Sequence, residues 1–179
     1  MNYANIVKNP NPDVYSGGYK NVMLFARRDD FLVLQKPTAA GLVLGDAVAI
    51  DTSHTFTTPD GFISWDAKQA SVTIKGTTTG EDGAAQLEWS GEIIVLGDSA
   101  STQEQMRNIL NDDVICLVKE SACLITDAYI QLGDECVSPV FKVEFDGKTT
   151  KEGMKEYKVT ITCKKKFFYT GVVTMAAEV

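Results

Sequence analysis

Residues 84–131 read AAQLEWSGEIIVLGDSASTQEQMRNILNDDVICLVKESACLITDAYIQ, and this stretch decides the fold class. Its middle, Ser101 to Asp112, has the features of a short helix between two blocks of strand. Glu104 follows Ser101 at the spacing of a capping box, in which each side chain satisfies a backbone N–H at the helix start. Apolar residues then recur at helical spacing on one face: Met106, Ile109 and Leu110. We therefore predict one helix, over residues 102–111.

Strand signals fill both sides of this helix. Val114 to Val118 is an uninterrupted apolar run, which is typical of a buried strand. Apolar and polar residues alternate, as in strands with one buried face, at 70–76, 122–131, 139–145 and 157–164. Gly91, inside an apolar strand pattern at 86–96, predicts a bulge or kink. About ten short strands and one flanking helix predict a mainly β protein, a β-sandwich or a closed barrel.

Two segments have too little regular pattern to belong to this core. Residues 1–19 are predicted to form an extended arm, because they contain two closely spaced prolines and a Ser-Gly-Gly run. Residues 36–60 are rich in Gly, Ala and Thr, with 47–50 and 55–58 as the predicted arms of a long, weakly packed hairpin. This extension is either a surface loop or an element that becomes ordered against another copy. The remaining chain, 20–179, is predicted to be a single β-rich domain that carries the extension.

Composition places limits on the function. The chain has 179 residues and a formal net charge of −7, which argues against binding to phosphate backbones. No apolar run in the first 20 residues is flanked by basic residues, so no secretory signal is expected, and no segment is apolar for long enough to span a membrane. The cysteines include no CxxC pair, and we expect four buried free thiols in a protein made in a reducing cytoplasm: Cys116, Cys123, Cys136 and Cys163.

No catalytic, cofactor-binding or metal site is predicted, and the protein is not expected to be an enzyme. His54 is the only histidine, and we expect it on the surface of the hairpin. The acidic pairs lie at predicted element ends, where carboxylates cap and solvate the chain. Lys164-Lys165-Lys166 adjoins Phe167-Phe168-Tyr169, which favours a charged guard on an edge strand over a site for single-stranded nucleic acid. Trp89 is expected in the core, whereas Trp65 is a candidate for stacking on a sugar.

The order of the elements, strands followed by a single helix and further strands in an acidic domain of this size, resembles that of phage tail tube proteins. Those proteins share a fold with the tube protein of the type VI secretion machine. The resemblance lies in architecture over most of the chain and includes no short motif. It implies a virion structural protein whose homo-oligomeric rings, hexameric in that family, stack into a tube through which DNA passes without specific binding. It further implies other virion tail proteins as partners, no membrane partner, synthesis in the host bacterial cytoplasm and a final location in the virion tail.

The same resemblance directs attention to the arm and the extension as the parts that contact neighbouring subunits. The expected interface residues are Val14, Tyr15, Tyr19, Leu42, Val43, Val48, Ile50 and Phe56. Other virion proteins, such as head–tail connectors and tail terminators, use related folds and remain open as alternatives. An alternative from another class is a β-sandwich module that binds a carbohydrate or receptor through Trp65 and nearby loops.

Overall fold

The computed structural model describes residues 18–37, 45–121, 129–149 and 153–177. Their strands form a six-stranded sheet in the order β3-β12-β9-β8-β1-β5, a four-stranded sheet in the order β10-β11-β7-β6, and a small β2–β4 ribbon. The strands are β1 (Tyr19–Arg27), β2 (Phe31–Val33), β3 (Ala49–Ile50), β4 (Thr55–Phe56), β5 (Ile63–Asp66), β6 (Thr73–Thr79), β7 (Gln86–Leu96), β8 (Val114–Glu120), β9 (Tyr129–Leu132), β10 (Val140–Asp146), β11 (Glu156–Cys163) and β12 (Lys166–Tyr169).

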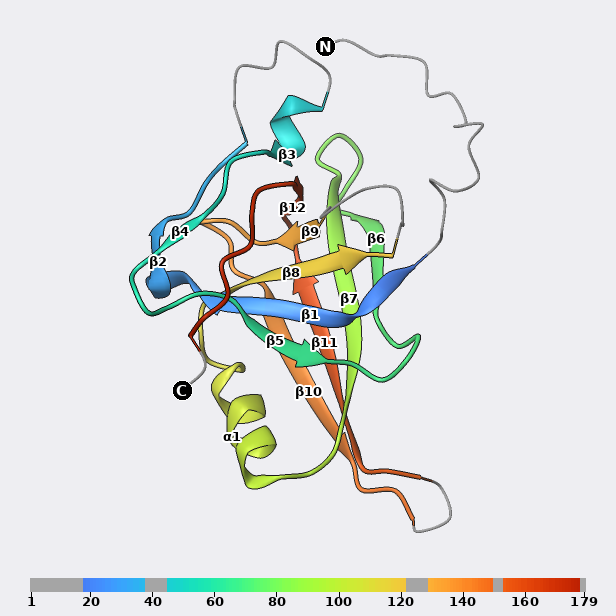
Figure 1. Cartoon of the computed structure of the whole chain (residues 1–179). Coiled ribbons are helices and arrows are strands. Elements are labelled where there is room, and N and C mark those ends of the chain that lie inside the picture. Colours follow the sequence, from blue (N-terminus) through green and yellow to red (C-terminus); the bar gives the residue numbers. More distant parts are fainter. Residues whose placement is uncertain (1–17, 38–44, 122–128, 150–152, 178–179) are drawn as a thin grey trace.

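The two larger sheets pack face to face, and their strands run across one another (Figure 1). Between them lies the main core, to which β11 contributes every second residue: Tyr157, Val159, Ile161 and Cys163. This alternation agrees with the pattern in the sequence. The predicted mainly β sandwich is confirmed, and the sheets do not close into a barrel within one chain.

A second apolar cluster covers the other face of the six-stranded sheet. In β1, Met23 points to the main core whereas Leu24 and Ala26 point to this outer cluster. The outer cluster is closed by Ile50 and Phe62, and Phe62 forms a bridge to Met175 near the end of the described chain. Because its central strands are buried on both faces, the sheet contains uninterrupted apolar runs such as the one in β8.

Helix α1 (Ala100–Asn108) lies at the lower end of the sandwich, beside β10 (Figure 1). It begins two residues before the predicted start because Ser99 is the N-cap, and the Ser99 Oγ accepts a hydrogen bond from the Thr102 N–H at 3.1 Å. The predicted capping box at Ser101 and Glu104 is wrong, since Ser101 already lies inside the helix. In the described part of the chain, no helix has the length and apolarity that crossing a bilayer requires.

The predicted hairpin within 36–60 is also wrong in its pairing. β3 pairs in parallel with β12, whereas β4 pairs with β2, so the two predicted arms belong to different sheets. Residues 38–44 of this extension, like residues 1–17 of the arm, lie outside the described residues. The bulge predicted at Gly91 is absent, because Gly91 pairs with Ile74 and Ile161 in continuous ladders.

Candidate functional site

His54 is buried in a polar network, and the prediction of a surface position is wrong. Its Nδ1 accepts a hydrogen bond from the Gln35 N–H at 3.0 Å, and its Nε2 lies 2.8 Å from Gln131 Oε1. Gln131 Nε2 donates to the Gly133 carbonyl, so Gln131 Oε1 accepts from His54 and the Nε2 atom carries the imidazole proton. Burial lowers the pKa of His54, while the Gln131 hydrogen bond opposes this shift.

This network is structural, because both ring nitrogens are occupied by partners from the chain itself. The His54 ring also stacks on Tyr169 with ring centroids 4.5 Å apart. His54 therefore ties the segments around β2 and β4 to β9 and β12 across the outer cluster. Gln131 and Tyr169 lie far from His54 in the sequence, so only the tertiary fold brings these residues together.

The cysteines and carboxylates form no reactive centre among the described residues. Cys116 and Cys163 are buried as predicted, but Cys136 is exposed in the β9–β10 connection, and Cys123 lies outside the described residues. Burial raises the pKa of the Cys116 thiol, so this thiol stays protonated. Within the described ranges, no three His, Cys, Asp or Glu residues lie close enough to hold a metal ion.

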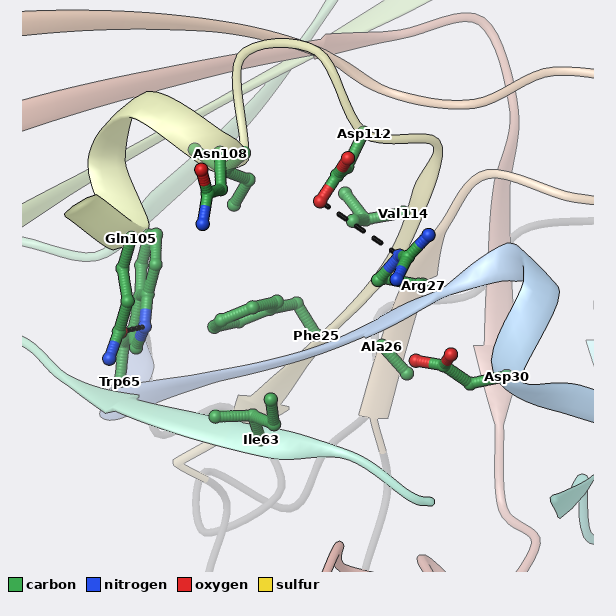
Figure 2. A pocket seen from close by; sticks show the side chains of 11 residues that line it. Phe25, Ala26, Arg27, Asp30, Ile63, Trp65, Gln105, Asn108, Asp112 and Val114 are labelled. Carbon is green, nitrogen blue, oxygen red and sulfur yellow. Dashed lines mark hydrogen bonds and ion pairs between the residues drawn. The ribbon is translucent and has the colours of Figure 1, made fainter. Parts of the chain in front are cut away.

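A pocket of about 210 Å³ lies between α1 and the β1–β5 pair (Figure 2). Phe25, Ile63 and Trp65 supply its apolar walls, and polar residues from α1 and the loops lie at its rim. Trp65 Nε1 donates to Gln105 Oε1 at 2.7 Å, and the indole packs edge-on against Phe25. Trp65 is only 6% exposed, so the indole face that the carbohydrate-binding alternative needs is not available at the surface.

The outward surface of the four-stranded sheet, opposite the core, is mostly hydrophilic. We call it the polar sheet face, and its polar residues are Thr73, Lys75, Thr77, Thr79, Gln86, Glu88, Ser90, Glu92, Lys142, Glu144, Asp146, Glu156, Lys158, Thr160 and Thr162. Three apolar residues lie on the same face: Ile94, Leu96 and Val140. Acidic residues outnumber lysines on it. Ion pairs connect some of them, as between Lys158 and Glu92 at 2.9 Å and between Lys142 and Glu144 at 2.6 Å. This polarity suits a surface that faces water across the whole width of the sheet.

β6 and β10 are the two end strands of this sheet, and neither has a strand on its outer side among the described residues. We call these two sides the open edges. All neighbours in the sheet are antiparallel, so β6 and β10 run in opposite directions. An edge strand presents unpaired N–H and C=O groups that can template pairing with another chain. Apolar side chains are also exposed on the β10 edge, where Val140 is 69% and Phe145 is 51% exposed.

A groove of about 320 Å³ lies beside the β10 edge, where α1 meets the sheet. Its apolar walls include Met106, Leu110, Val143 and Phe145. At its end, Asp98 accepts hydrogen bonds from Tyr157 Oη at 3.1 Å and Lys155 Nζ at 2.8 Å. The Lys155 hydrogen bond, followed by the Tyr157 hydrogen bond, lowers the pKa of Asp98. The β10 edge therefore combines open backbone groups with exposed apolar surface.

The structure places the expected interface residues in different environments. Ile50 is 2% exposed within the outer cluster, against which Phe56 packs, whereas Val48 is exposed. Tyr19 is half-buried at the start of β1 and packs against the main core. Val14, Tyr15, Leu42 and Val43 lie outside the described residues. Sequence reasoning missed the open edges, whose only local signals are the threonine-rich alternation of β6 and the apolar Val140 on the polar side of β10.

Comparisons of this chain with known proteins found no matching protein-family model, no matching curated protein and no matching solved structure. What the protein does is therefore inferred from its own fold and surfaces. Among these surfaces, the four-stranded sheet combines a largely polar face with two open edges.

Proposed function

We propose that this protein is a structural subunit that assembles with copies of itself into rings, and that these rings stack into a phage tail tube. The observation that carries the proposal is the four-stranded sheet, whose two open edges run in opposite directions on either side of a polar face. The proposed activity is geometric, and it includes no chemical step.

The two open edges suit a head-to-tail contact between copies. Because β6 and β10 are antiparallel to each other, placing β6 of one copy beside β10 of the next continues the antiparallel alternation of the sheet. A contact between two different patches is heterologous, and it generates a closed ring when its rotation closes. Ring closure also pairs both end strands of the four-stranded sheet, which removes the aggregation hazard of these two edges.

In such a ring, the polar sheet face would line the central channel. With about 4.8 Å between strands and strands tilted by about 35° to the axis, as in closed barrels, six copies would give a circumference of roughly 140 Å and a backbone diameter of about 45 Å. The excess of acidic residues on this face, together with the net charge of −7, suits a channel that repels phosphate and lets DNA pass without binding. Both features support a role in the virion tail, with other tail proteins as partners.

The proposal is tested by light scattering on the purified full-length protein over a concentration series, with negative-stain images of the same samples. We expect the mean mass to rise with concentration and the images to show rings or tubes with a central channel. A strictly monomeric protein at every concentration, including after addition of preformed tail-tip complexes as an initiator, would contradict self-assembly. Compact dimers without a channel would contradict the ring.

A further inference from the structure

We infer that β6 pairs with β10 of the next copy in one defined register, with Thr73 opposite Asp146 and Thr79 opposite Val140. This inference rests on the proposed function and names the partner surface and its pairing. It follows from three independent features of the four-stranded sheet: the lengths of its edge strands, their offset, and the side chains that they carry.

The two strands match in length, because β6 and β10 each contain seven residues. Within one copy, however, they are not level with each other. β6 pairs with residues 86–92 of β7. β10 pairs with residues 156–162 of β11, which in turn pair with residues 90–96 of β7. The two edges are therefore offset by four residues along the strand direction.

Full pairing of β6 with the next β10 transfers this offset to the ring. At about 3.3 Å per residue, an offset of four residues displaces each copy by about 13 Å along the strand direction relative to the preceding copy. At about 4.8 Å per strand, the four strands of one copy span about 19 Å across the sheet. The resulting strand tilt is about 35°, which lies at the value that closed barrels adopt. A sheet with this stagger therefore closes with tilted strands, and pairing of all seven residues requires no distortion of the subunit.

The same register places compatible side chains opposite each other on both faces. On the polar sheet face, Lys75 lies opposite Glu144 of the next copy, and such opposite charges stabilise a cross-strand pair. Lys75 has no ion-pair partner among the described residues of its own chain. On the core side of the sheet, the exposed Phe145 lies opposite Ile74 of the adjacent copy, and this Ile74 already packs against the main core of its own chain.

Neighbouring registers are worse for physical reasons. A shift by one residue turns the polar side chains of one strand toward the core side of the other. A shift by two residues in one direction sets Lys75 opposite Lys142, which places like charges against each other. The same shift in the other direction still sets Lys75 opposite an acidic residue, Asp146. It leaves only five residues of each strand paired, and it sets Phe145 opposite Gly76, whose vacant side-chain position is occupied by the Trp89 ring.

Interchain disulfide cross-linking tests this register on the assembled full-length protein. The background carries Cys123→Ser and Cys136→Ser, which remove the exposed Cys136 thiol and the Cys123 thiol outside the described residues. In this background, one variant carries Lys75→Cys with Glu144→Cys. The control carries Lys75→Cys with Lys142→Cys, which would be opposite each other only after a two-residue shift. After mild oxidation, we expect a covalent ladder of oligomers from the first variant and little cross-linking from the control.

A charge exchange provides a second readout that needs no cysteine. We expect Lys75→Glu to raise the concentration needed for assembly by about tenfold, because an attractive pair becomes repulsive at every interface. Adding Glu144→Lys should restore assembly. Efficient cross-linking of the control would overturn the register while leaving the proposed function intact. The same holds if rings assemble but the first variant does not cross-link and the charge exchange does not restore assembly. Absence of assembly by the unsubstituted protein would instead overturn the proposed function.

Discussion

Replacing His54 by phenylalanine should destabilise the protein strongly although the ring stack on Tyr169 can remain. The substitution leaves the Gln35 N–H and Gln131 Oε1 without the partners that they contact at 3.0 and 2.8 Å. A buried polar group without a partner costs about 1–3 kcal/mol, so two such groups cost about 2–6 kcal/mol. For a chain of this size, a loss of about 4 kcal/mol lowers the melting temperature by roughly 8–16 °C.

The same substitution should remove a specific pH dependence. Well above pH 6.5, the unperturbed pKa of histidine, His54 is neutral in both the folded and the unfolded state, so its titration does not affect stability there. As the pH falls below 6.5, the unfolded chain takes up a proton that the folded state resists because its His54 pKa is lowered. Stability is then lost at up to about 1.4 kcal/mol per pH unit until the folded pKa is reached.

Urea denaturation of both proteins at pH 7.5, 6.5 and 5.5 measures these effects, at protein concentrations at which light scattering shows monomers. We expect the stability gap between wild type and His54→Phe to be widest at pH 7.5 and to narrow toward pH 5.5. Because the chain contains one histidine, NMR titration of its imidazole signals reports His54 without ambiguity. A gap below about 1 kcal/mol at pH 7.5, a gap that does not change with pH, or an imidazole pKa at or above 6.5 would refute the reasoning.

Three further substitutions test the fold by thermal or urea unfolding. Ser99→Ala should cost about 1 kcal/mol through loss of the N-cap, whereas Ser101→Ala should cost much less, and equal costs would contradict the helix start assigned here. Ile50→Ala should lower stability by about 2–5 kcal/mol because Ile50 fills the outer cluster, whereas Val48→Ala at an exposed position should change it by less than about 0.5 kcal/mol. Gly76→Ala should destabilise the β6–β7 pair by about 1–3 kcal/mol, because the new Cβ would lie 2.7 Å from the adjacent indole ring, and an unchanged melting temperature would show that this ring moves freely.

The main strands and the helix could be predicted because their signals are local. Alternation in β11 and the apolar run in β8 report burial directly, since side chains of a strand point alternately to its two faces. The helix was found from its apolar stripe, yet its first residue was missed because two serines, Ser99 and Ser101, compete for the same capping role. The predicted and observed helix starts therefore differ by two residues, which is less than one helical turn.

Long-range features could not be predicted in this way. His54 looked like a surface residue because its neighbours in the sequence are threonine and serine, whereas Gln131 and Tyr169, its partners in space, are 77 and 115 residues away. The supposed hairpin arms around Ile50 and Phe56 each have local strand character, but strand character does not specify a partner. Ile50 was therefore expected at an interface and lies in its own core.

The sequence by itself determined the fold class and the absence of any recognisable catalytic motif, because composition, periodicity and motif spacing act over a few residues. Only the tertiary structure decided which strands are neighbours, and with them the outer cluster, the polar sheet face and the two open edges. The physical reason is that backbone pairing in a sheet is chemically nearly uniform along the chain. The choice of partner is made by the packing of side chains that lie far apart in sequence, as β6 and β10 do at opposite ends of one sheet.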